Sequence, residues 1–318
     1  MVDNICIIGC GNIGFRHLES ILKFKKKLNI IIVEKNSDRQ KKIINSLNNS
    51  FRYSHSIKFY KYIKFSLLNF KLLIVSTNSD TRKDILCNFF TKKNSAETIL
   101  LEKILAPNLS NLNKIVEIIN NRKIKSYVNC ARRMYKSYQV LKKMIGKRKI
   151  LQFNVKGSNW GLASNSIHML DLFGYLYGNF SNVKSSHDLK KIYPSKRRRF
   201  YELRGKIKII INNSSTITME DLINKKNKFE IEIVGKNFKY TVKEFENKVI
   251  YNDKVKNLIN KVHLFDVPFQ SSLTSELLYK KIKLTSLYES YKYHKILIKL
   301  FDSYFKMFKK NNTNYLIT

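Results

Sequence analysis

The stretch Ile5-Cys6-Ile7-Ile8-Gly9-Cys10-Gly11-Asn12-Ile13-Gly14 decides the fold of this chain. Its apolar start predicts a short buried strand, and residues 13–27, with apolar side chains on one face, predict a helix. The GxGxxG pattern between them allows a tight turn, a close approach of a pyrophosphate to the backbone, and close packing of the helix on the strand. The free amide groups that begin the helix are suited to bind the phosphates. We therefore expect a dinucleotide to contact Gly9, Gly11, Asn12, Ile13 and Gly14.

An acidic residue stands where this pattern needs one. Glu34 closes the apolar stretch 29–33, which predicts the second strand. A carboxylate at that point accepts hydrogen bonds from a ribose and repels a 2′-phosphate. NAD is therefore expected in preference to NADP, although Lys35 beside Glu34 blurs the distinction. The alternative is a glycine turn that shapes the fold and binds no ligand.

Further along the chain, apolar strands alternate with amphipathic helices. Strands are predicted at 71–76 and 98–101, and helices at 38–47, 80–91 and 109–121. This alternation is typical of a parallel sheet that is covered on both faces. We expect a dinucleotide-binding Rossmann domain at residues 1–124.

The pattern changes after about residue 126. Strands at 127–131 and 149–156, helices at 135–145 and 166–177, and alternating apolar residues between 206 and 251 predict a half-exposed, largely antiparallel sheet. Residues 272–310 are predicted to form one or two helices. The predicted fold class is α/β: an N-terminal doubly wound parallel sheet, and a C-terminal α/β domain with a mostly antiparallel open sheet. The second domain is expected at residues 125–318, for substrate binding and oligomerisation.

The charge is strongly basic, with 61 Lys and Arg against 23 Asp and Glu and a net charge of +38 over 318 residues. Nucleic acid or an anionic surface is one explanation. However, the basic residues are spread over every segment, and Asn and Ile are enriched with Lys, as an AT-rich genome produces. The chain shows no helix-turn-helix, RNA-binding sheet motif or zinc site. A nucleic-acid-binding protein is therefore the less favoured alternative, and no specific nucleic acid is expected as a partner.

Localisation and metal content follow from other absences in the sequence. No apolar run approaches the roughly 18–20 residues that span a bilayer, so no membrane partner is expected. The N-terminus has no basic start or small-residue cleavage site, and the four cysteines form no paired CxxC motif. We expect a cytoplasmic protein with reduced thiols. Five of the histidines lack metal-ligand spacing, so no metal site is expected. A structural or surface role is assigned to these five: His17, His55, His187, His263 and His294.

Several later motifs resemble one oxidoreductase family in order and spacing. Leu101-Glu102-Lys103-Ile104-Leu105-Ala106 is similar to the EKPLA signature of the glucose–fructose oxidoreductase, inositol dehydrogenase and rhizopine catabolism (Gfo/Idh/MocA) family. Val75-Ser76-Thr77-Asn78 resembles its TP/TN turn, residues 129–135 its N-x-R strand, and His168-Met169-Leu170-Asp171 its HxxD helix. Residues 157–162 and 165–168 resemble a subgroup found among surface-polysaccharide and nonulosonic-acid sugar genes.

The resemblance implies an NAD(P)-dependent dehydrogenase or reductase acting on CH-OH groups. It implies hydride transfer between nicotinamide and a secondary hydroxyl or ketone of a sugar or activated sugar, in surface-polysaccharide sugar biosynthesis. It also implies a homodimer or homotetramer formed through the open sheet. The cofactor contacts would include Thr77, Asn78 and Glu102.

The chemistry of the motif residues fits these roles. The Lys103 ammonium can stabilise charge on the reacting oxygen, and His168 can exchange a proton near neutral pH. Asp171, three residues further along one helix, can orient that imidazole, which completes the catalytic set. Expected substrate contacts are a guanidinium, a stacking ring and an amide, from Arg133, Trp160 and Asn165. Each of these roles has a structural alternative. Lys103 would then be a solvated surface lysine and His168 a core histidine. Arg132 and Arg133 would be an exposed basic pair, and Trp160 a buried anchor.

Two departures from the family pattern matter. The family proline is Ile104 here, so no special bend is assumed at that peptide. The family acid four residues before the histidine is Ser164, and the glycine two residues after that acid is Ser166. The loss of the acid supports an alternative function, a catalytically inactive nucleotide-binding sensor or scaffold protein that retains the Rossmann domain.

Overall fold

The computed structural model describes residues 2–50, 54–222, 228–266, 271–278, 282–307 and 316–317. The chain forms two compact units, Met1–Ala131 with Phe269–Tyr291, and Arg132–Pro268 with Lys292–Thr318. The division therefore differs from the expected boundary between residues 124 and 125. Residues 125–131 and a later segment of the chain belong to the first unit.

The first unit contains a seven-stranded sheet in the order β15-β6-β5-β4-β1-β2-β3. Its strands are β1 (Asp3–Ile8), β2 (Leu28–Val33), β3 (Ser56–Tyr60), β4 (Asn69–Val75), β5 (Ser95–Leu101), β6 (Lys125–Val128) and β15 (Thr285–Ser286). The neighbouring pairs are parallel except at β15, which is antiparallel to β6. This strand order, which reverses direction between β1 and β4, defines a doubly wound Rossmann sheet.

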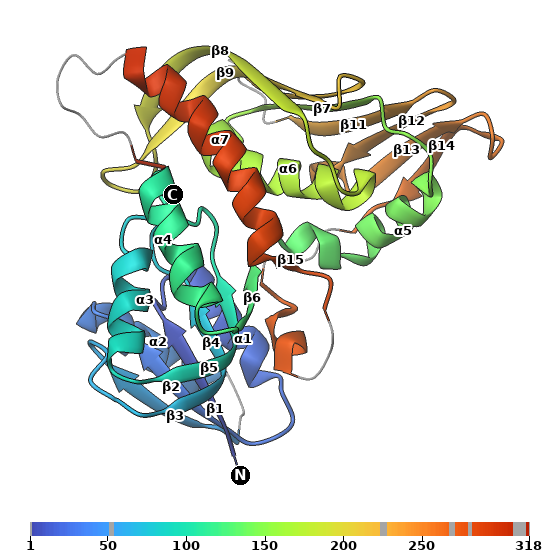
Figure 1. Cartoon of the computed structure of the whole chain (residues 1–318). Helices are drawn as coiled ribbons and strands as arrows, with labels where there is room; N and C mark the ends of the chain where they lie inside the picture. The colour runs from blue at the N-terminus through green and yellow to red at the C-terminus, as the bar shows by residue number, and fades with distance from the viewer. Residues whose placement is uncertain are drawn as a thin grey trace. The chain divides into compact units, whose positions relative to one another are not determined.

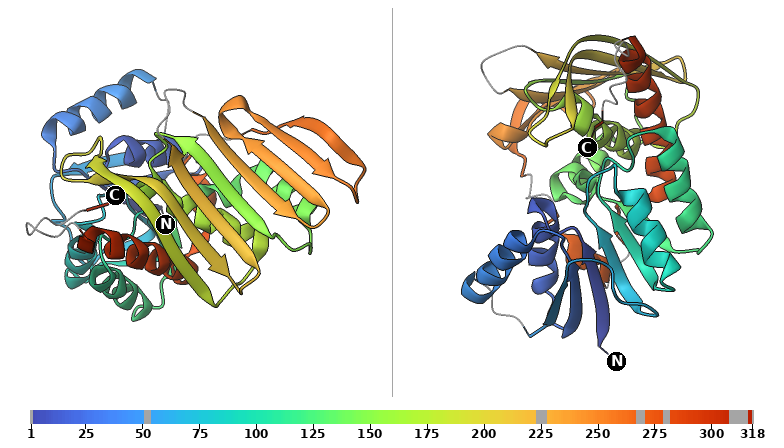
Figure 2. Two further views of the ribbon diagram at one scale, coloured as in Figure 1. Left: turned by 90° about the horizontal axis from the view of Figure 1, so that it is seen from above. Right: turned by 90° about the vertical axis from the view of Figure 1, so that its left-hand side faces the viewer.

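Helices cover both faces of this sheet, as the sequence predicted. They are α1 (Asn12–Leu22), α2 (Ser37–Ser50), α3 (Arg82–Thr91) and α4 (Leu109–Asn120). The right-hand view of Figure 2 shows α1 and α2 on one face and α3 and α4 on the other. Because both faces are covered, residues 5–8 and 72–75 are almost entirely buried. Strand β3 was not predicted, because its side chains alternate between exposed and partly buried positions.

The second unit contains an eight-stranded sheet in the order β14-β13-β12-β11-β7-β10-β9-β8. Its strands are β7 (Gln152–Ser158), β8 (Val183–Pro194), β9 (Tyr201–Ile211), β10 (Ser215–Leu222), β11 (Phe229–Gly235), β12 (Phe238–Lys243), β13 (Lys248–Asp253) and β14 (Leu258–Leu264). Only β7 and β10 pair in parallel among these strands as described. The predicted mostly antiparallel sheet is thus confirmed.

One face of this sheet is packed and the other is open. The packed face carries α5 (Lys136–Ile145) and α6 (Leu162–Tyr177), visible beside the strands in Figure 1. Along β9, Ile207 and Ile209 are buried whereas Lys206 and Lys208 are exposed. This alternation is what a sheet with one solvated face requires. Together the two sheets confirm the predicted α/β class.

The C-terminal region departs from the prediction of helices throughout residues 272–310. The described part contains a short 3-10 helix, η3 (Thr274–Leu278), then β15, and only then the long helix α7 (Leu287–Met307). Residues 279–281 and 308–310 lie outside the described residues. Thr285 and Ser286 pair with Val128 and Tyr127, so sheet hydrogen bonds replace helical ones there. Of the helices described, none combines the length and apolar character needed to cross a membrane.

Candidate functional site

Glycine is present for different physical reasons at the three positions of the turn after β1. Gly9 has a φ of +84°, and a Cβ there would lie 2.7 Å from Thr77 Cγ2. A Cβ at Gly14 would lie 2.1 Å from the Gly9 carbonyl oxygen. At Gly11 φ is −70°, and among the described residues a Cβ would meet only Arg39 Nη1, at 3.6 Å. Backbone and packing therefore explain Gly9 and Gly14 but leave Gly11 without an internal reason.

The start of α1 is open to an anion. Gly11 is the N-cap of this helix, and no side chain caps it. The first amide groups of a helix lack intrahelical partners and carry the positive end of its dipole. The predicted phosphate contacts Gly11, Asn12 and Ile13 thus lie together at an uncapped helix N-terminus.

The Glu34 carboxylate lies beside this turn. It accepts hydrogen bonds from Cys10 N (2.9 Å) and Asn36 N (3.0 Å), and Arg39 Nη1 lies 3.7 Å from its Oε2. The side chain is only 5% exposed. Glu34 therefore joins the glycine turn to the start of α2 and brings a negative charge to the end of β2.

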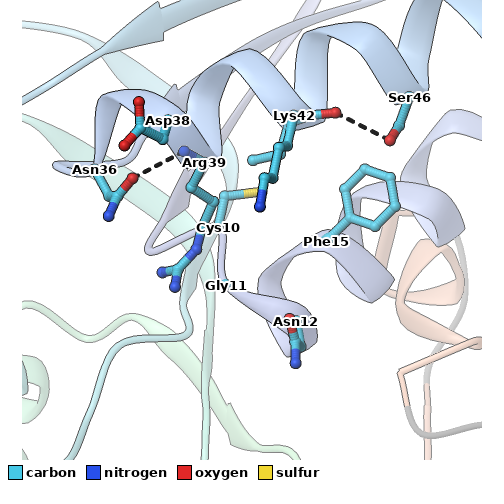
Figure 3. Close-up of a pocket in the computed structure, with 10 residues that line it drawn as sticks. Cys10, Gly11, Asn12, Phe15, Asn36, Asp38, Arg39, Lys42 and Ser46 are labelled. Atoms are coloured by element: carbon cyan, nitrogen blue, oxygen red, sulfur yellow. Dashed lines mark hydrogen bonds between the residues drawn. The ribbon is translucent and has the colours of Figure 1, made fainter.

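A pocket of about 480 Å³ adjoins the glycine turn. It is lined by Cys10, Gly11, Asn12, Phe15, Asn36, Asp38, Arg39, Lys42, Ile43 and Ser46. Figure 3 shows the Arg39 and Lys42 side chains reaching from α2 toward the turn. Burial, and then the nearby Glu34, raise the pKa of the Cys10 thiol to about 12 although Arg39 opposes the shift, so this thiol stays protonated and does not act as a nucleophile. A volume of this order is typical of small-molecule sites.

The turn after β4 carries the next two predicted cofactor residues. Thr77 Oγ1 is buried and has no hydrogen-bond partner within the described residues. The fully buried Arg82 donates to the carbonyl oxygens of Thr77, Ile104 and Leu105, and so joins this turn to the segment after β5. The Asn78 carbonyl accepts from Thr81 Oγ1 at 3.2 Å. The turn is thus fixed by hydrogen bonds from side chains to its carbonyl oxygens, and its one buried hydroxyl has no partner among the described residues.

Glu102 and Lys103 follow β5 at the carboxyl edge of the sheet. The Glu102 carboxylate is 5% exposed and accepts from His17 Nε2 (2.8 Å) and Asn129 Nδ2. These partners make a structural role explicit for Glu102, and a contact to cofactor stays a prediction. The peptide between Lys103 and Ile104 is cis, although Ile104 replaces the family proline.

In the second unit, the predicted catalytic helix α6 holds His168 and Asp171. His168 is 5% exposed and Asp171 is fully buried. The Asp171 carboxylate accepts from Arg133 Nε at 2.8 Å, and Arg133 Nη2 donates to the Asp171 carbonyl at 3.3 Å. The structure therefore brings two predicted site residues together in an unexpected pair. Orientation of His168 by Asp171 and substrate binding by Arg133 stay predictions.

Trp160 and Asn165 lie at the start of α6. Asn165 Nδ2 donates to the Trp160 carbonyl at 2.6 Å, and Trp160 Nε1 donates to the Glu220 carbonyl at 3.0 Å. The indole ring also lies 5.5 Å from the Phe229 ring. Both side chains therefore fix the loop before α6, and their contact with a substrate stays a prediction.

The sequence did not lead us to predict two buried acidic residues beside this loop, Glu202 and Asp221. Glu202 Oε2 accepts from Ala163 N (3.0 Å) and Ser164 N (3.3 Å), so a carboxylate from β9 caps the first amides of α6 beside Ser164. Asp221 accepts from Asn159 N at 2.7 Å, and burial raises the pKa of Asp221. For Asp221 the sequence did contain a signal. It shares the buried face of β10 with Ile217 and Met219, because it follows them at two-residue spacing.

The described residues form a Rossmann domain whose glycine turn ends in an uncapped helix N-terminus, and a second domain with a mostly antiparallel sheet. The model of the oxidoreductase family GFO_IDH_MocA, NAD-binding Rossmann fold, matches residues 4–130. The first unit's Rossmann domain belongs to this family, which confirms the resemblance found in the sequence. The match places residues 4–130 in an oxidoreductase family with an NAD-binding Rossmann fold.

Solved structures of low sequence identity share the fold over almost the whole chain. UDP-N-acetylglucosamine 3-dehydrogenase from Acidithiobacillus ferrooxidans has a TM-score of 0.68 at 11% identity, covering 94% of this chain and 97% of that one. An oxidoreductase from Agrobacterium radiobacter, solved with NAD+, L-tartaric acid and magnesium, has a TM-score of 0.68 at 14% identity, covering 95% and 96%. The transcriptional regulator Gal80p from Kluyveromyces lactis has a TM-score of 0.70 at 13% identity, covering 96% and 90%. A comparison with curated proteins gives no match.

The glycine turn provides the first test. Gly11→Val should abolish NAD binding because its side chain fills the space that the phosphates need, while the circular dichroism spectrum stays unchanged. Gly14→Ala is a comparison variant, since its Cβ would meet the Gly9 carbonyl at 2.1 Å. It should lower the free energy of unfolding by about 1–3 kcal/mol, which Gly11→Val should not do. Unchanged NAD affinity in Gly11→Val, measured by calorimetry, would show that the turn does not bind phosphate.

Proposed function

We propose that this protein transfers a hydride between NAD and a secondary hydroxyl or ketone of a sugar or activated sugar. The observation that carries the proposal is Gly11, where neither the backbone angle nor internal packing requires glycine. A ligand that approaches the backbone closely supplies the missing reason. The uncapped start of α1 suits its phosphates, and the buried Thr77 Oγ1 offers a further polar group.

Glu34 supports NAD as the cofactor. Its buried carboxylate follows β2 and, within the described part of the chain, accepts hydrogen bonds from two backbone amides and pairs with Arg39 at 3.7 Å. A second negative charge from a 2′-phosphate would meet it in a site of low dielectric, where like charges repel strongly. Arg39 and Lys42 line the pocket and favour an anionic ligand in general, so Glu34 is the residue that discriminates.

Glu34→Gln should narrow the preference for NAD. The amide still offers an oxygen to Cys10 N but no longer repels a phosphate, so the NADP affinity should rise by about tenfold relative to NAD. The exposed control Asp84→Asn should leave the ratio unchanged. Wild-type protein that binds NADP more tightly than NAD in calorimetry would contradict the assignment of Glu34.

The proposed chemistry uses groups from both units. Nicotinamide, when bound, supplies the hydride donor or acceptor. Lys103 follows a strand at the carboxyl edge of the sheet, where ligands bind in doubly wound folds, and its ammonium would stabilise charge on the substrate oxygen. His168 would exchange the hydroxyl proton, because imidazole titrates near neutral pH.

A sugar nucleotide is the proposed substrate class. The support is the shared fold with a UDP-N-acetylglucosamine 3-dehydrogenase, together with the polar loop before α6. There Trp160 offers a ring for stacking on a sugar, and Asn165, Glu202 and Asp221 bring an amide and two carboxylates to the same loop. A role in surface-polysaccharide sugar biosynthesis remains part of the proposal and rests on the sequence resemblance.

Lys103→Met and His168→Asn should each slow hydride transfer by about 10²–10⁴-fold. NAD affinity should stay nearly unchanged, because neither change touches the glycine turn. The controls are Lys64→Met and His263→Asn at exposed positions, which should keep the wild-type rate. The measurement is stopped-flow absorbance of NADH, with UDP-N-acetylglucosamine first and then other sugar nucleotides. Wild-type rates in both site variants would overturn the mechanism.

A second candidate function is a nucleotide-binding sensor without catalysis. It is favoured by Ser164 in place of the family acid and by the fold shared with a transcriptional regulator. Glu202, hydrogen-bonded to Ser164 N, counts against it because a carboxylate is present at that helix start. Tight NADH binding by wild-type protein, with no turnover on the whole panel of sugar nucleotides, would select the sensor.

The open face of the second sheet is proposed as the contact between identical chains. Across neighbouring strands it carries a row of alternating charge: Lys206, Glu220, Lys156, Glu230 and Lys243. Two copies related by a two-fold axis can place the acids of one row opposite the lysines of the other.

The charge pattern of this face predicts that the chain forms oligomers, and that reversing charges on the face weakens their association. The wild-type chain should be a homodimer or homotetramer by light scattering at moderate salt. Glu220→Lys with Glu230→Lys should weaken association at least about tenfold, because like charges then face each other. The control Glu97→Lys, at an exposed position of β5 in the first unit, should leave the oligomer mass unchanged. A monomeric wild-type protein would refute this contact.

A further inference from the structure

A cluster of buried polar side chains joins four separate parts of the chain within the first unit. His17 comes from α1, Glu102 and Asn129 follow β5 and β6, and Ser271 and Thr274 belong to the segment that returns from the second unit. All five residues are at most 5% exposed. The proposed reaction uses none of these side chains except Glu102, for which a cofactor contact was expected.

The hydrogen bonds around His17 indicate its protonation state. Thr274 Oγ1 donates to the Ser271 carbonyl at 2.8 Å, so its single proton is used and its oxygen accepts from His17 Nδ1 at 2.7 Å. The other ring nitrogen, Nε2, lies 2.8 Å from Glu102 Oε1. If Glu102 is ionised, its carboxylate can only accept, so Nε2 then also carries a proton. This arrangement satisfies every bond with a doubly protonated ring.

The alternative arrangement is electrostatically poorer. A neutral His17 would take the Thr274 proton at Nδ1, which removes the bond to the Ser271 carbonyl. Among the described residues, it would also leave the buried Glu102 carboxylate with hydrogen bonds from uncharged donors alone, His17 and Asn129. A buried charge without a counter-ion is costly, whereas a hydrogen-bonded ion pair offsets much of that cost.

We propose that His17 is an imidazolium that forms a buried ion pair with Glu102, and that this pair positions the Lys103 turn. Glu102 N donates to the Val75 carbonyl at 3.0 Å, while its carboxylate is held by His17 and Asn129. Both the backbone and the side chain of the residue before Lys103 are therefore fixed. The protonation state is independent of the proposed function, and only the role toward Lys103 rests on it.

The protonation state is measured by ¹⁵N NMR of the histidine rings at pH 7, with His17→Asn used to assign the signal. The two nitrogens of an imidazolium resonate close together, whereas those of a neutral ring are far apart. Wild-type His17 should show the imidazolium pattern, and Glu102→Gln should convert it to a neutral ring, because an amide can donate to Nε2. A neutral His17 in the wild-type protein would overturn the ion pair.

The positioning role is measured by hydrogen exchange with mass spectrometry. His17→Asn should speed exchange of the backbone amides of residues 102–105 by about tenfold or more. Ser20→Ala is the matched control, since Ser20 also joins α1 to the returning segment, through the Ser272 carbonyl and Ser275 N. It removes that connection without changing the charge, so exchange at residues 102–105 should stay at the wild-type rate. Equal acceleration in both variants would mean that the cluster only holds the segment in place and would overturn the positioning role.

Binding of NADH separates the two roles of Glu102. If the carboxylate serves His17, Glu102→Gln should change NADH affinity by less than about threefold, whereas loss of a direct hydrogen bond to cofactor costs about tenfold or more. The larger loss would overturn the assignment of Glu102 to His17. Failure of wild-type protein to bind NADH at all would refute the proposed function but leave the NMR result intact.

Discussion

The structure of the first unit depends on the close contact between the backbone at Gly9 and the backbone at Gly14. A single added Cβ at Gly14 would lie 2.1 Å from the Gly9 carbonyl oxygen, so α1 can approach β1 only because that atom is absent. This approach sets the direction in which the first amides of α1 point. It also puts His17, three residues further along α1, within hydrogen-bond distance of Glu102 at the end of β5. One steric condition therefore orients both the first amides of α1 and the polar cluster around His17.

Carboxylates are scarce in this basic chain, and several of them are buried and hold local structure together. Glu34 joins the glycine turn to α2, and Glu202 holds the start of α6. In the second unit, the Glu244 carboxylate accepts hydrogen bonds from Nε and Nη2 of Arg132, each at 2.8 Å. Burial of Glu244 raises its pKa, but the Arg132 guanidinium outweighs this and holds the pKa of Glu244 below its ordinary value. The excess lysines are spread on the surface, as base composition predicts, while the acids fix the loops that carry the site.

The sequence predicted the features that depend on local order. The glycine turn, Glu34 and the strand before Lys103 were predictable because their roles follow from position within a strand–turn–helix unit. The partners of Glu102 were not, since His17 and Thr274 lie far away in sequence and only the folded sheet brings them to it. The helix predicted from residue 272 was wrong near Thr285, where pairing with β6 outweighs helical propensity. Neither the pair of Arg133 with Asp171 nor the acid at Glu202 had a local signal.

The first unit is built from two stretches of chain, with most of the second unit between them. During synthesis on a ribosome, its sheet can form through β6 long before Ser271 and Thr274 are made. Until then His17 lacks its hydroxyl partner, and β6 remains the edge of the sheet, since β15 has not yet been added. An uncovered edge strand is a template for pairing with other chains. The topology therefore leaves β6 as an uncovered edge in the nascent chain until the residues of β15 have been made.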